Sequence, residues 1–393
     1  MKILIISFYY KPDLSAGSFR TASFVKALKK QLSYADTIEI VTTMPNRYSS
    51  FKVEAEEFET SGNVSTKRII ILSHKSGFLD QARSFMVYFI ETIKYVRSKN
   101  YDAVFATSSR LFSAFLGAII SRQKGIPLYL DIRDIFVDTM RSLFTGTKQK
   151  FLIPLLIFIE KYTMLSAYKI NLISEGFLPY FKEKYQIEYS FFPNGVDDDF
   201  LIFSADDARK AFGDKVVFTY TGNIGEGQGL ERIVPQIAQK YKNIEFHIIG
   251  DGGRKRILRE CTEHLWNVRL FDPVNRKDLI ALYKQSDVLF LQLNDYDAFK
   301  KVLPSKIFEY AATYKPIIAG VDGYAKEFLK KYLPDVLIYN PCDFDDFCRK
   351  YDCFTGTIDI EKRKEFIAKF LRQKIMDEMA RDFLDSMDRY RRS

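Results

Sequence analysis

Short apolar runs alternate with longer amphipathic segments along most of this chain. Runs of four to six consecutive apolar residues are typical of parallel strands that are buried on both faces. The segments between them, such as 18–33, carry apolar residues on one side and predict helices. In the first half, strands are predicted at 2–7, 37–43, 68–72, 101–106, 127–132 and 168–173. This alternation predicts an α/β fold with a doubly wound parallel sheet.

The same rhythm starts again after a turn-rich acidic segment at 192–199. Strands are predicted at 216–221, 244–249, 267–271, 287–293 and 316–319. We therefore expect a boundary near 195–205, with Rossmann-like domains at 1–198 and 199–360 and a helical segment at 361–393. Two such sheets are expected to face a cleft at the carboxyl ends of their strands, with the last helix packing back on the first domain.

Composition narrows the class of protein. Of the 393 residues, 47% are hydrophobic, which excludes a disordered chain. Four cysteines without a CxxC pair and three histidines argue against a disulfide framework and a metalloenzyme, and favour a reducing cytoplasm. The net charge of +9 fits nucleic acid, an anionic membrane surface or phosphorylated substrates. The sequence shows no nucleic-acid-binding motif and no interleaving of basic with aromatic residues. We therefore exclude nucleic acid as a partner.

Two apolar segments bear on membrane contact. The run after Met1 is too short for a signal peptide and is interpreted as a strand. The stretch 151–159 falls short of the ~20 apolar residues that span a bilayer. Segment 151–168 lies either on an anionic leaflet or, the interpretation that we favour for this segment alone, against the first domain's sheet. The net charge of +6 through Phe200 supports membrane proximity.

The clearest chemical feature is a glycine-rich loop within 220–230. Four glycines in eight residues follow a predicted strand and precede a helix beginning near Leu230. Glycine lets a ligand approach the backbone, and a helix N-terminus offers free N–H groups to an anion, so we favour phosphate binding over a plain turn. The spacing matches neither a P-loop nor a dinucleotide fingerprint, which ranks ATPases and NAD enzymes low.

Two further glycine loops follow predicted strands. Gly17 opens the helix that contains Arg20, and 250–253 leads into a basic stretch. An ordinary helix start and an Asp-Gly turn remain the alternatives for these two loops.

In this order and spacing, the motifs resemble the retaining nucleotide-sugar glycosyltransferases with the two-Rossmann GT-B fold. The resemblance is to the bacterial branch that assembles capsule, O-antigen and exopolysaccharide. It covers nearly the whole chain and is carried by segments 8–12 with Gly17 and Arg20, 131–136, 193–197, 220–223, 249–252, 286–288 and 303–311.

The resemblance implies transfer of a sugar, an N-acetylated or deoxy hexose, from a UDP-sugar to a polyprenyl-diphosphate-linked saccharide with retained configuration. The first domain would bind the acceptor and the second the donor. No permanently bound cofactor and no metal are implied, because basic side chains and helix N-termini stabilise the leaving diphosphate. The protein would be cytoplasmic and peripherally attached to the inner face of the membrane.

The resemblance also assigns roles to residues. Glu309 would hold the ribose, Ser305 and Lys306 would meet the diphosphate, and Gly250 with the loop 272–274 would cradle the base. Separately from the resemblance, the position of Asp134 at the carboxyl end of a predicted strand suits a general base or a residue that orients acceptor hydroxyls. The candidate catalytic residues are Asp134, Arg133 and Lys306. The candidate substrate-binding residues are Gly17, Arg20, Gly222, Asn223, Gly225, Gln228, Gly250, Pro273, Val274, Ser305 and Glu309. For Asp131, Arg133 and Asp134, an internal ion pair is the alternative to a role in the cleft.

Three positions depart from the family pattern. Asn223 and Gln228 stand where many relatives have Arg and Lys, so Lys306 with Arg133 or Arg20 would supply the cations. Lys301 replaces the first glutamate of a pair, so that its contact to the donor sugar is either missing or supplied by Asp295 or Asp297. Arg133-Asp134 replaces a common His-Asp step. These departures keep two alternatives open, which are a non-catalytic partner subunit and a sugar-nucleotide epimerase of the same architecture.

Overall fold

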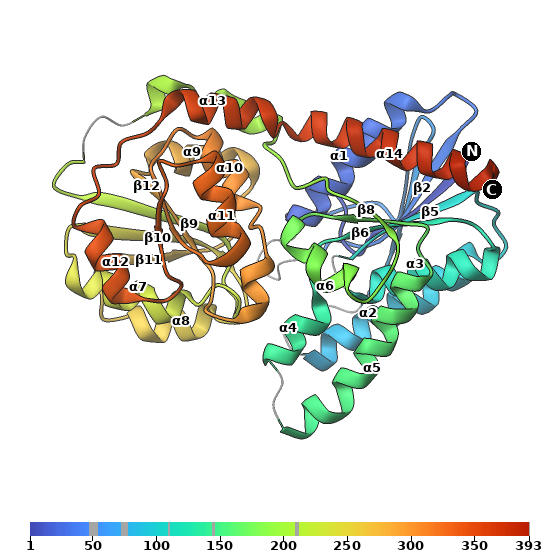
Figure 1. Ribbon diagram of the computed structural model, residues 1–393, viewed down its shortest axis with the longest axis horizontal. Coiled ribbons are helices and arrows are strands. Elements are labelled where there is room, and N and C mark those ends of the chain that lie inside the picture. Colours follow the sequence, from blue (N-terminus) through green and yellow to red (C-terminus); the bar gives the residue numbers. More distant parts are fainter. Residues whose placement is uncertain (47–53, 72–77, 109–110, 144–145, 209–211, 393) are drawn as a thin grey trace. The chain divides into compact units, whose positions relative to one another are not determined.

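The computed structural model describes residues 1–46, 54–71, 78–108, 111–143, 146–208 and 212–392. Packing divides the chain into two compact units (Figure 1). Unit 1 comprises Met1–Asn194 and Gln373–Ser393, and unit 2 comprises Gly195–Arg372. The segment predicted as one helical tail at 361–393 is therefore shared between the two units.

Unit 1 is built on a sheet of eight described strands in the order β3-β4-β2-β1-β5-β6-β7-β8. Neighbouring strands pair in parallel, and β3 pairs antiparallel with β4. The strands are β1 (Lys2–Ile6), β2 (Thr37–Thr43), β3 (Phe58–Ser61), β4 (Val64–Ile69), β5 (Ala103–Thr107), β6 (Leu128–Ile132), β7 (Lys169–Leu172) and β8 (Glu188–Ser190). The doubly wound sheet predicted for the first half is confirmed. The strand predicted at 68–72 begins earlier, and residue 72 lies outside the described residues.

Helices pack around the sheet of unit 1. They are α1 (Ala16–Gln31), α2 (Phe78–Val96), α3 (Leu111–Lys124), α4 (Phe136–Leu143), α5 (Gly146–Leu165), α6 (Leu178–Lys182) and α14 (Arg372–Arg392), with the 3-10 helix η1 (Glu175–Phe177). All but α14 come from the first 194 residues, and α14 comes from the C-terminal part of the chain. Helix α5 packs on α3 and α4, with Ile153, Leu156 and Ile159 in a shared apolar cluster. Segment 151–165 is helical, but its main neighbours are the helices α3 and α4 and not the sheet against which segment 151–168 was predicted to pack.

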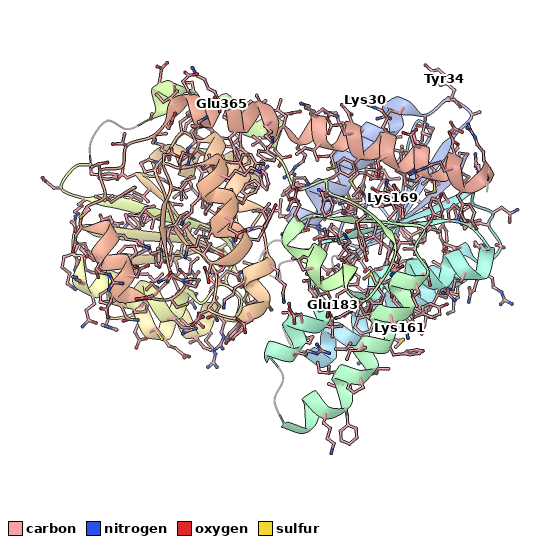
Figure 2. The ribbon with its side chains drawn as sticks, viewed as in Figure 1. Lys30, Tyr34, Lys161, Lys169, Glu183 and Glu365 are labelled. Atoms are coloured by element: carbon pink, nitrogen blue, oxygen red, sulfur yellow. The ribbon has the colours of Figure 1, made fainter. Side chains whose placement is uncertain are left out.

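The C-terminal helix α14 packs on unit 1, as predicted. The ring of Phe383 is fully buried and lies 6.0 Å from the Phe24 ring and 5.6 Å from the Tyr129 ring, measured between centroids. The Asp382 carboxylate accepts a 2.8 Å hydrogen bond from the Tyr129 hydroxyl and pairs with Lys169, which is labelled in Figure 2. The last twenty residues thus complete the core that the first 194 begin.

Unit 2 is built on a sheet of six described parallel strands in the order β11-β10-β9-β12-β13-β14. The strands are β9 (Val216–Asn223), β10 (Ile244–Asp251), β11 (Val268–Phe271), β12 (Val288–Gln292), β13 (Ile317–Gly320) and β14 (Leu337–Tyr339). The strand order reverses between β9 and β12. In doubly wound sheets, ligands bind at the carboxyl ends of the strands beside such a reversal.

Helices connect the strands of unit 2. They are α7 (Leu230–Lys240), α8 (Lys255–Thr262), α9 (Arg276–Gln285), α10 (Lys306–Ala312), α11 (Gly323–Tyr332), α12 (Phe344–Tyr351) and α13 (Ile360–Lys369), with 3-10 helices η2 (Asp198–Ile202), η3 (Ala205–Asp207) and η4 (Asp297–Lys301). The core that α7 shares with the sheet combines aliphatic side chains with Phe218, Phe246 and Phe290, which are fully buried. The parallel α/β architecture predicted for the second half is confirmed.

The two ends of unit 2 are paired with each other. The Val196 N–H donates to the Phe370 carbonyl at 2.7 Å, and the Arg372 N–H donates to the Val196 carbonyl at 2.8 Å. A Cβ at Gly195 would lie 2.7 Å from the Arg372 Cα, so only glycine allows this approach. We call these two segments, Gly195–Asp197 and Phe370–Arg372, the chain crossing.

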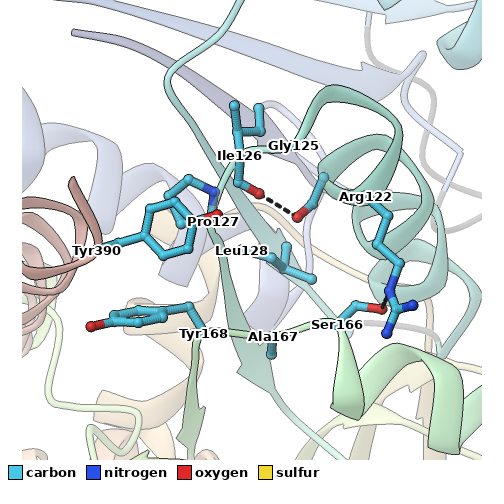
Figure 3. A pocket seen from close by; sticks show the side chains of 10 residues that line it. Arg122, Gly125, Ile126, Pro127, Leu128, Ser166, Ala167, Tyr168 and Tyr390 are labelled. Atoms are coloured by element: carbon cyan, nitrogen blue, oxygen red, sulfur yellow. Dashed lines mark hydrogen bonds between the residues drawn. The ribbon is translucent and has the colours of Figure 1, made fainter. Parts of the chain in front are cut away.

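A hollow of about 260 Å³ opens at the amino ends of β6 and β7 in unit 1 (Figure 3). Arg122, Tyr168 and Tyr390 are among its lining residues, and the Arg122 guanidinium donates to the Ser166 hydroxyl at 2.7 Å. Because parallel α/β sheets bind ligands at the carboxyl ends of their strands, we do not assign the functional site to this hollow.

Candidate functional site

The glycine-rich loop of unit 2 leaves β9 at the point where the strand order reverses. Gly222 is near the end of β9 with a φ of 117°, and Gly250 faces it on β10 with a φ of 154°. A Cβ at Gly250 would overlap the Gly222 carbonyl oxygen. Both positions thus require glycine, and the two strands present bare backbone at the start of the loop.

Lys306, the first residue of α10, lies beside this bare backbone. Its Nζ is 3.1 Å from the position that a Cβ at Gly222 would occupy, and it donates to the Tyr220 hydroxyl at 3.1 Å. Burial lowers the pKa of Lys306 to about 8, and the Glu309 carboxylate acts in the opposite direction. A partly buried cation next to backbone that carries no side chain is suited to bind an anion.

The two amides that stand in place of basic residues bond to each other. The Asn223 Nδ2 donates to Gln228 Oε1 at 2.9 Å, and the Gly225 N–H donates to the same oxygen at 3.1 Å. The Gln228 side chain therefore stabilises the loop by accepting hydrogen bonds from two of its other residues. The structure thus brings together the five predicted residues Gly222, Asn223, Gly225, Gln228 and Lys306.

A second cation reaches this loop from the end of β10. The Arg254 guanidinium pairs with the Glu226 carboxylate in the loop and lies 3.5 Å from Glu231. The Tyr296 hydroxyl donates to Glu226 Oε1 at 2.8 Å. Sequence reasoning missed Arg254, although its position directly after the glycines at 250–253 was a usable signal.

Glu309 lies one helical turn beyond Lys306 on α10. Its Oε1 is 3.3 Å from Nη1 of Arg276, and its Oε2 accepts a 3.4 Å hydrogen bond from the Tyr283 hydroxyl. Arg276 is the first residue of α9 and was not among the predicted site residues. Ser305 stands at the N-cap of α10, and among the described groups its side chain makes no capping hydrogen bond.

The residues predicted to hold the base lie at the ends of β10 and β11. Lys255 Nζ donates to the Gly250 carbonyl at 2.7 Å and pairs with Asp272 at 2.7 Å. Pro273 and Val274 follow directly and are half-buried before α9 begins. Lys255 thus ties the Gly250 backbone to the loop that carries Pro273 and Val274.

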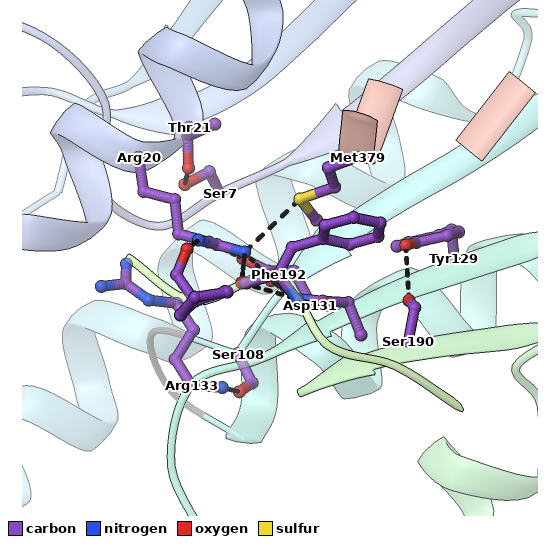
Figure 4. A network of polar contacts seen from close by, with 12 residues as sticks. Ser7, Arg20, Thr21, Ser108, Tyr129, Asp131, Arg133, Ser190, Phe192 and Met379 are labelled. Atoms are coloured by element: carbon purple, nitrogen blue, oxygen red, sulfur yellow. Dashed lines mark hydrogen bonds and ion pairs between the residues drawn. The ribbon is translucent and has the colours of Figure 1, made fainter. Parts of the chain in front are cut away.

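In unit 1, Arg133 and Asp134 follow β6 and lie near the start of α1. A Cβ at Gly17 would overlap the Arg133 guanidinium, so glycine at this position makes room for it. The Arg133 N–H donates to the Ser108 hydroxyl at 2.9 Å (Figure 4). Burial raises the pKa of Asp134 to about 7, with Arg133 lowering it and Glu160 raising it further. The structure thus places Gly17, Arg133 and Asp134 in one cluster.

Arg20 is used inside unit 1. Its guanidinium donates to both oxygens of Asp131, at 2.8 and 2.9 Å, and to the carbonyls of Phe192 and Pro193, each at 2.7 Å (Figure 4). The side chains of Arg20 and Asp131 are each 2% exposed. This is the internal ion pair that the sequence left open for Asp131. The same guanidinium holds the backbone at 192–193 beside the sheet of unit 1.

The described residues contain neither a metal-binding cluster nor a membrane-spanning helix. Among them, no group of three or more His, Cys, Asp and Glu side chains is arranged to hold a metal ion. Likewise, none of their helices is both long enough and apolar enough to cross a bilayer.

Comparisons with known proteins point to one class of enzyme. Residues 204–367 match the family described as glycosyl transferases group 1. The chain is 26% identical over 353 residues to the putative colanic acid biosynthesis glycosyl transferase WcaI of Escherichia coli K12, covering 83% of this chain and 84% of WcaI.

Two solved structures share the fold of the whole chain. The sucrose-phosphate synthase of Thermosynechococcus elongatus is similar with a TM-score of 0.75 at 15% identity, covering 98% of each chain. Anabaena Alr3699/HepE, solved in complex with UDP and glucose, has a TM-score of 0.69 at 15% identity, covering 98% of this chain and 100% of its own. The comparisons therefore show that the chain has the GT-B fold, and residues 204–367 carry the match to glycosyl transferases group 1.

Proposed function

We propose that this protein is a glycosyltransferase that moves a sugar from a UDP-sugar to a lipid-linked oligosaccharide, with retention of configuration, in the synthesis of a surface polysaccharide. The observation that carries the proposal is the position of the Lys306 ammonium beside the bare backbone of Gly222. That position suits the diphosphate of a nucleotide sugar, and HepE, of similar fold, was solved with UDP and glucose. The similarity to WcaI supports a polysaccharide product.

The proposed chemistry is electrostatic. When the bond from the sugar to the diphosphate breaks, negative charge develops on the diphosphate, and a preorganised cation and N–H groups lower the free energy of that state. Lys306 would supply the cation, beside the bare backbone of Gly222 and with Ser305 nearby. Glu309 would accept hydrogen bonds from the ribose, and Gly250, Pro273 and Val274 would line the base.

Unit 1 would supply the groups that handle the acceptor. A carboxyl group with a pKa of about 7, as in Asp134, exchanges protons readily near neutral pH. Arg133 beside it would orient or attract a diphosphate-linked acceptor. We leave Arg20 out of the proposed site, because its hydrogen bonds hold Asp131 and the 192–193 carbonyls.

The acceptor is proposed to be lipid-linked, which requires approach to a membrane. On α5, Phe151, Leu155 and Phe158 are 70%, 54% and 65% exposed and are spaced so that they share one helix face. Lys150 is exposed near the start of this face, and Lys161 is exposed near its end (Figure 2). An apolar face flanked by lysines suits the inner, anionic leaflet, so we propose a cytoplasmic enzyme that attaches peripherally there.

Radiolabelled transfer tests the proposal. The purified protein is incubated with a panel of UDP-sugars and polyprenyl-diphosphate-linked acceptors in vesicles, with and without EDTA. We expect transfer that survives EDTA, and its loss in Lys306→Ala and Glu309→Ala. Lys277→Ala, an exposed cation on α9, is the matched control and should retain transfer.

Three outcomes would contradict the proposal. Full transfer by Lys306→Ala and Glu309→Ala would remove the site. Conversion of the donor without acceptor would indicate an epimerase. Tight UDP binding without transfer to any acceptor of the panel would favour a non-catalytic partner subunit.

A further inference from the structure

Arg276 lies between three carboxylates of unit 2. Its guanidinium pairs with Asp197, lies 3.3 Å from Asp199 Oδ2 and lies 3.3 Å from Glu309 Oε1. The flat face of the guanidinium lies 4.2 Å from the centroid of the Phe200 ring. These contacts come from α9, η2 and α10, so Arg276 joins elements that are far apart in the sequence.

Asp197 connects Arg276 to the chain crossing. Its Oδ1 forms an ion pair with Arg372, 2.8 Å from Nη1, while its Oδ2 pairs with Arg276. Arg372 also donates to the Gly195 carbonyl at 3.1 Å. A row of charged contacts therefore runs from the paired backbone of the crossing, through Asp197 and Arg276, to Glu309.

The contacts on Glu309 constrain its carboxylate without using it fully. One oxygen faces Arg276 at 3.3 Å and the other faces the Tyr283 hydroxyl at 3.4 Å, both near the long limit of a hydrogen bond. A carboxylate has about four lone-pair positions, so two such contacts leave acceptor capacity for incoming hydroxyl groups.

We propose that Arg276 is a positioning residue, which holds the Glu309 carboxylate in place for the ribose hydroxyls of the donor. Through Asp197, Arg276 also connects Glu309 to the chain crossing. The inference rests on the proposed function, since it assumes a nucleotide at this site. It adds a specificity role: Arg276 sets how strongly the site distinguishes ribose from a sugar without hydroxyls. A side chain held in one orientation loses less freedom when the ligand binds, which is how a non-contacting residue raises selectivity.

Calorimetric titration with UDP and with 2′,3′-dideoxy-UDP tests this role. The full chain is compared with Arg276→Gln, Asp197→Asn, Glu309→Gln and Lys277→Gln. The measured quantity is the ratio of the two dissociation constants, which reports contact with the ribose hydroxyls. For the unmodified chain we expect UDP to bind about 10-fold or more tightly than the dideoxy analogue.

The variants have distinct expected results. Glu309→Gln and Arg276→Gln should bring the ratio to within about threefold of unity, with little change in affinity for the dideoxy analogue. Asp197→Asn, which keeps Arg276 but weakens its anchor, should lower the ratio less. Lys277→Gln removes the same charge from the next residue of α9 and should leave the ratio unchanged. Circular dichroism confirms folding of each variant, and Asp197→Asn serves if Arg276→Gln does not fold.

Two results would overturn the inference. If Arg276→Gln weakens both ligands equally, the residue only maintains structure. If Arg276→Gln and Asp197→Asn keep the full ratio while Glu309→Gln loses it, Glu309 needs no help from Arg276. Failure of the proposed function looks different, because the unmodified chain would then bind neither ligand, and the inference would fall with it.

Discussion

The Lys306 ammonium lies 3.1 Å from the Tyr220 hydroxyl and 4.6 Å from the centre of the same ring. Tyr220 is fully buried, so the lysine is held against the end of β9 by an aromatic side chain as well as by its own helix. This environment is poorly hydrated, which explains why the pKa of Lys306 falls to about 8.

Lys306 makes UDP affinity sensitive to alkaline pH. Below pH 8 the side chain is a cation, and above pH 8 it loses its proton and its attraction for a diphosphate. We expect about 3- to 10-fold weaker binding at pH 9 than at pH 7.5. In Lys306→Arg the charge persists, so this loss should vanish. Titration of UDP itself is common to both proteins, and parallel curves for the two would contradict the prediction.

Gly250 cannot take a side chain without moving two strands. A methyl group there would overlap the Gly222 carbonyl oxygen, and the φ of 154° disfavours any other residue. Gly250→Ala should destabilise unit 2 by about 3 kcal/mol and abolish UDP binding. Trp266 is the single tryptophan of the chain and belongs to unit 2, so its fluorescence follows urea unfolding of that unit. Gly253→Ala, which meets open space, is the control and should cost less than about 1 kcal/mol.

Phe383 ties the C-terminal helix to the core of unit 1. Its ring is fully buried against Phe24, Phe105 and Tyr129. Phe383→Ala should lower the free energy of unfolding by about 3–5 kcal/mol, seen by circular dichroism. Tyr390→Ala, at a side chain that is 37% exposed, should cost much less. Equal losses in the two variants would mean that α14 adds little to the core.

Asp134 should make stability fall as pH rises. Burial raises the pKa of its carboxyl group to about 7, so between pH 4 and 7 the folded state binds a proton that the unfolded state has released. Raising the pH through this window therefore costs stability. Asp134→Asn, which stays neutral, should be more stable than the unmodified protein at pH 8, by the order of 2–4 kcal/mol, and equal to it near pH 4. A constant difference across this range of pH would count against a buried acid.

The apolar face of α5 should bind anionic vesicles. Replacing Phe151, Leu155 and Phe158 together by Ser should reduce co-sedimentation with anionic vesicles at least about 10-fold, because each side chain contributes when it enters the acyl region. Thermal stability should change little, since all three are exposed. The control is Ile70→Ser, because Ile70 directly follows β4 and its exposed fraction of 66% is similar. Unchanged sedimentation of the triple variant would rule out this face as the membrane contact.

The sequence was sufficient for the central strands because they are buried on both faces. β3, β8 and β14 were missed, since they are short strands at the sides of their sheets with few consecutive apolar residues. The tail was predicted as one helical segment, but it breaks at Phe370–Leu371. There Phe370 packs on Phe308 and Phe328, and Leu371 pairs with Val196.

The site could be predicted as far as local motifs reach. Gly222, Gln228 and Lys306 belong to recognisable segments, and the structure brings them together. Arg276 was missed because its significance comes from Glu309, 33 residues away, and from Asp197, 79 residues away. Such relationships depend on how helices end beside one another, which no spacing along the chain reveals.

The division of unit 1 between both ends of the chain affects the order of events during synthesis. Unit 2 is a continuous insert and can complete its fold while the ribosome is still making the tail. Unit 1 has to wait for residues 373–393, which are translated after unit 2. Until then, the apolar surface around Phe24 and Tyr129 lacks its cover, so a nascent or truncated chain exposes it to chaperones and proteases. A premature stop near residue 372 would therefore damage the first part of the chain to be made rather than the part next to the stop.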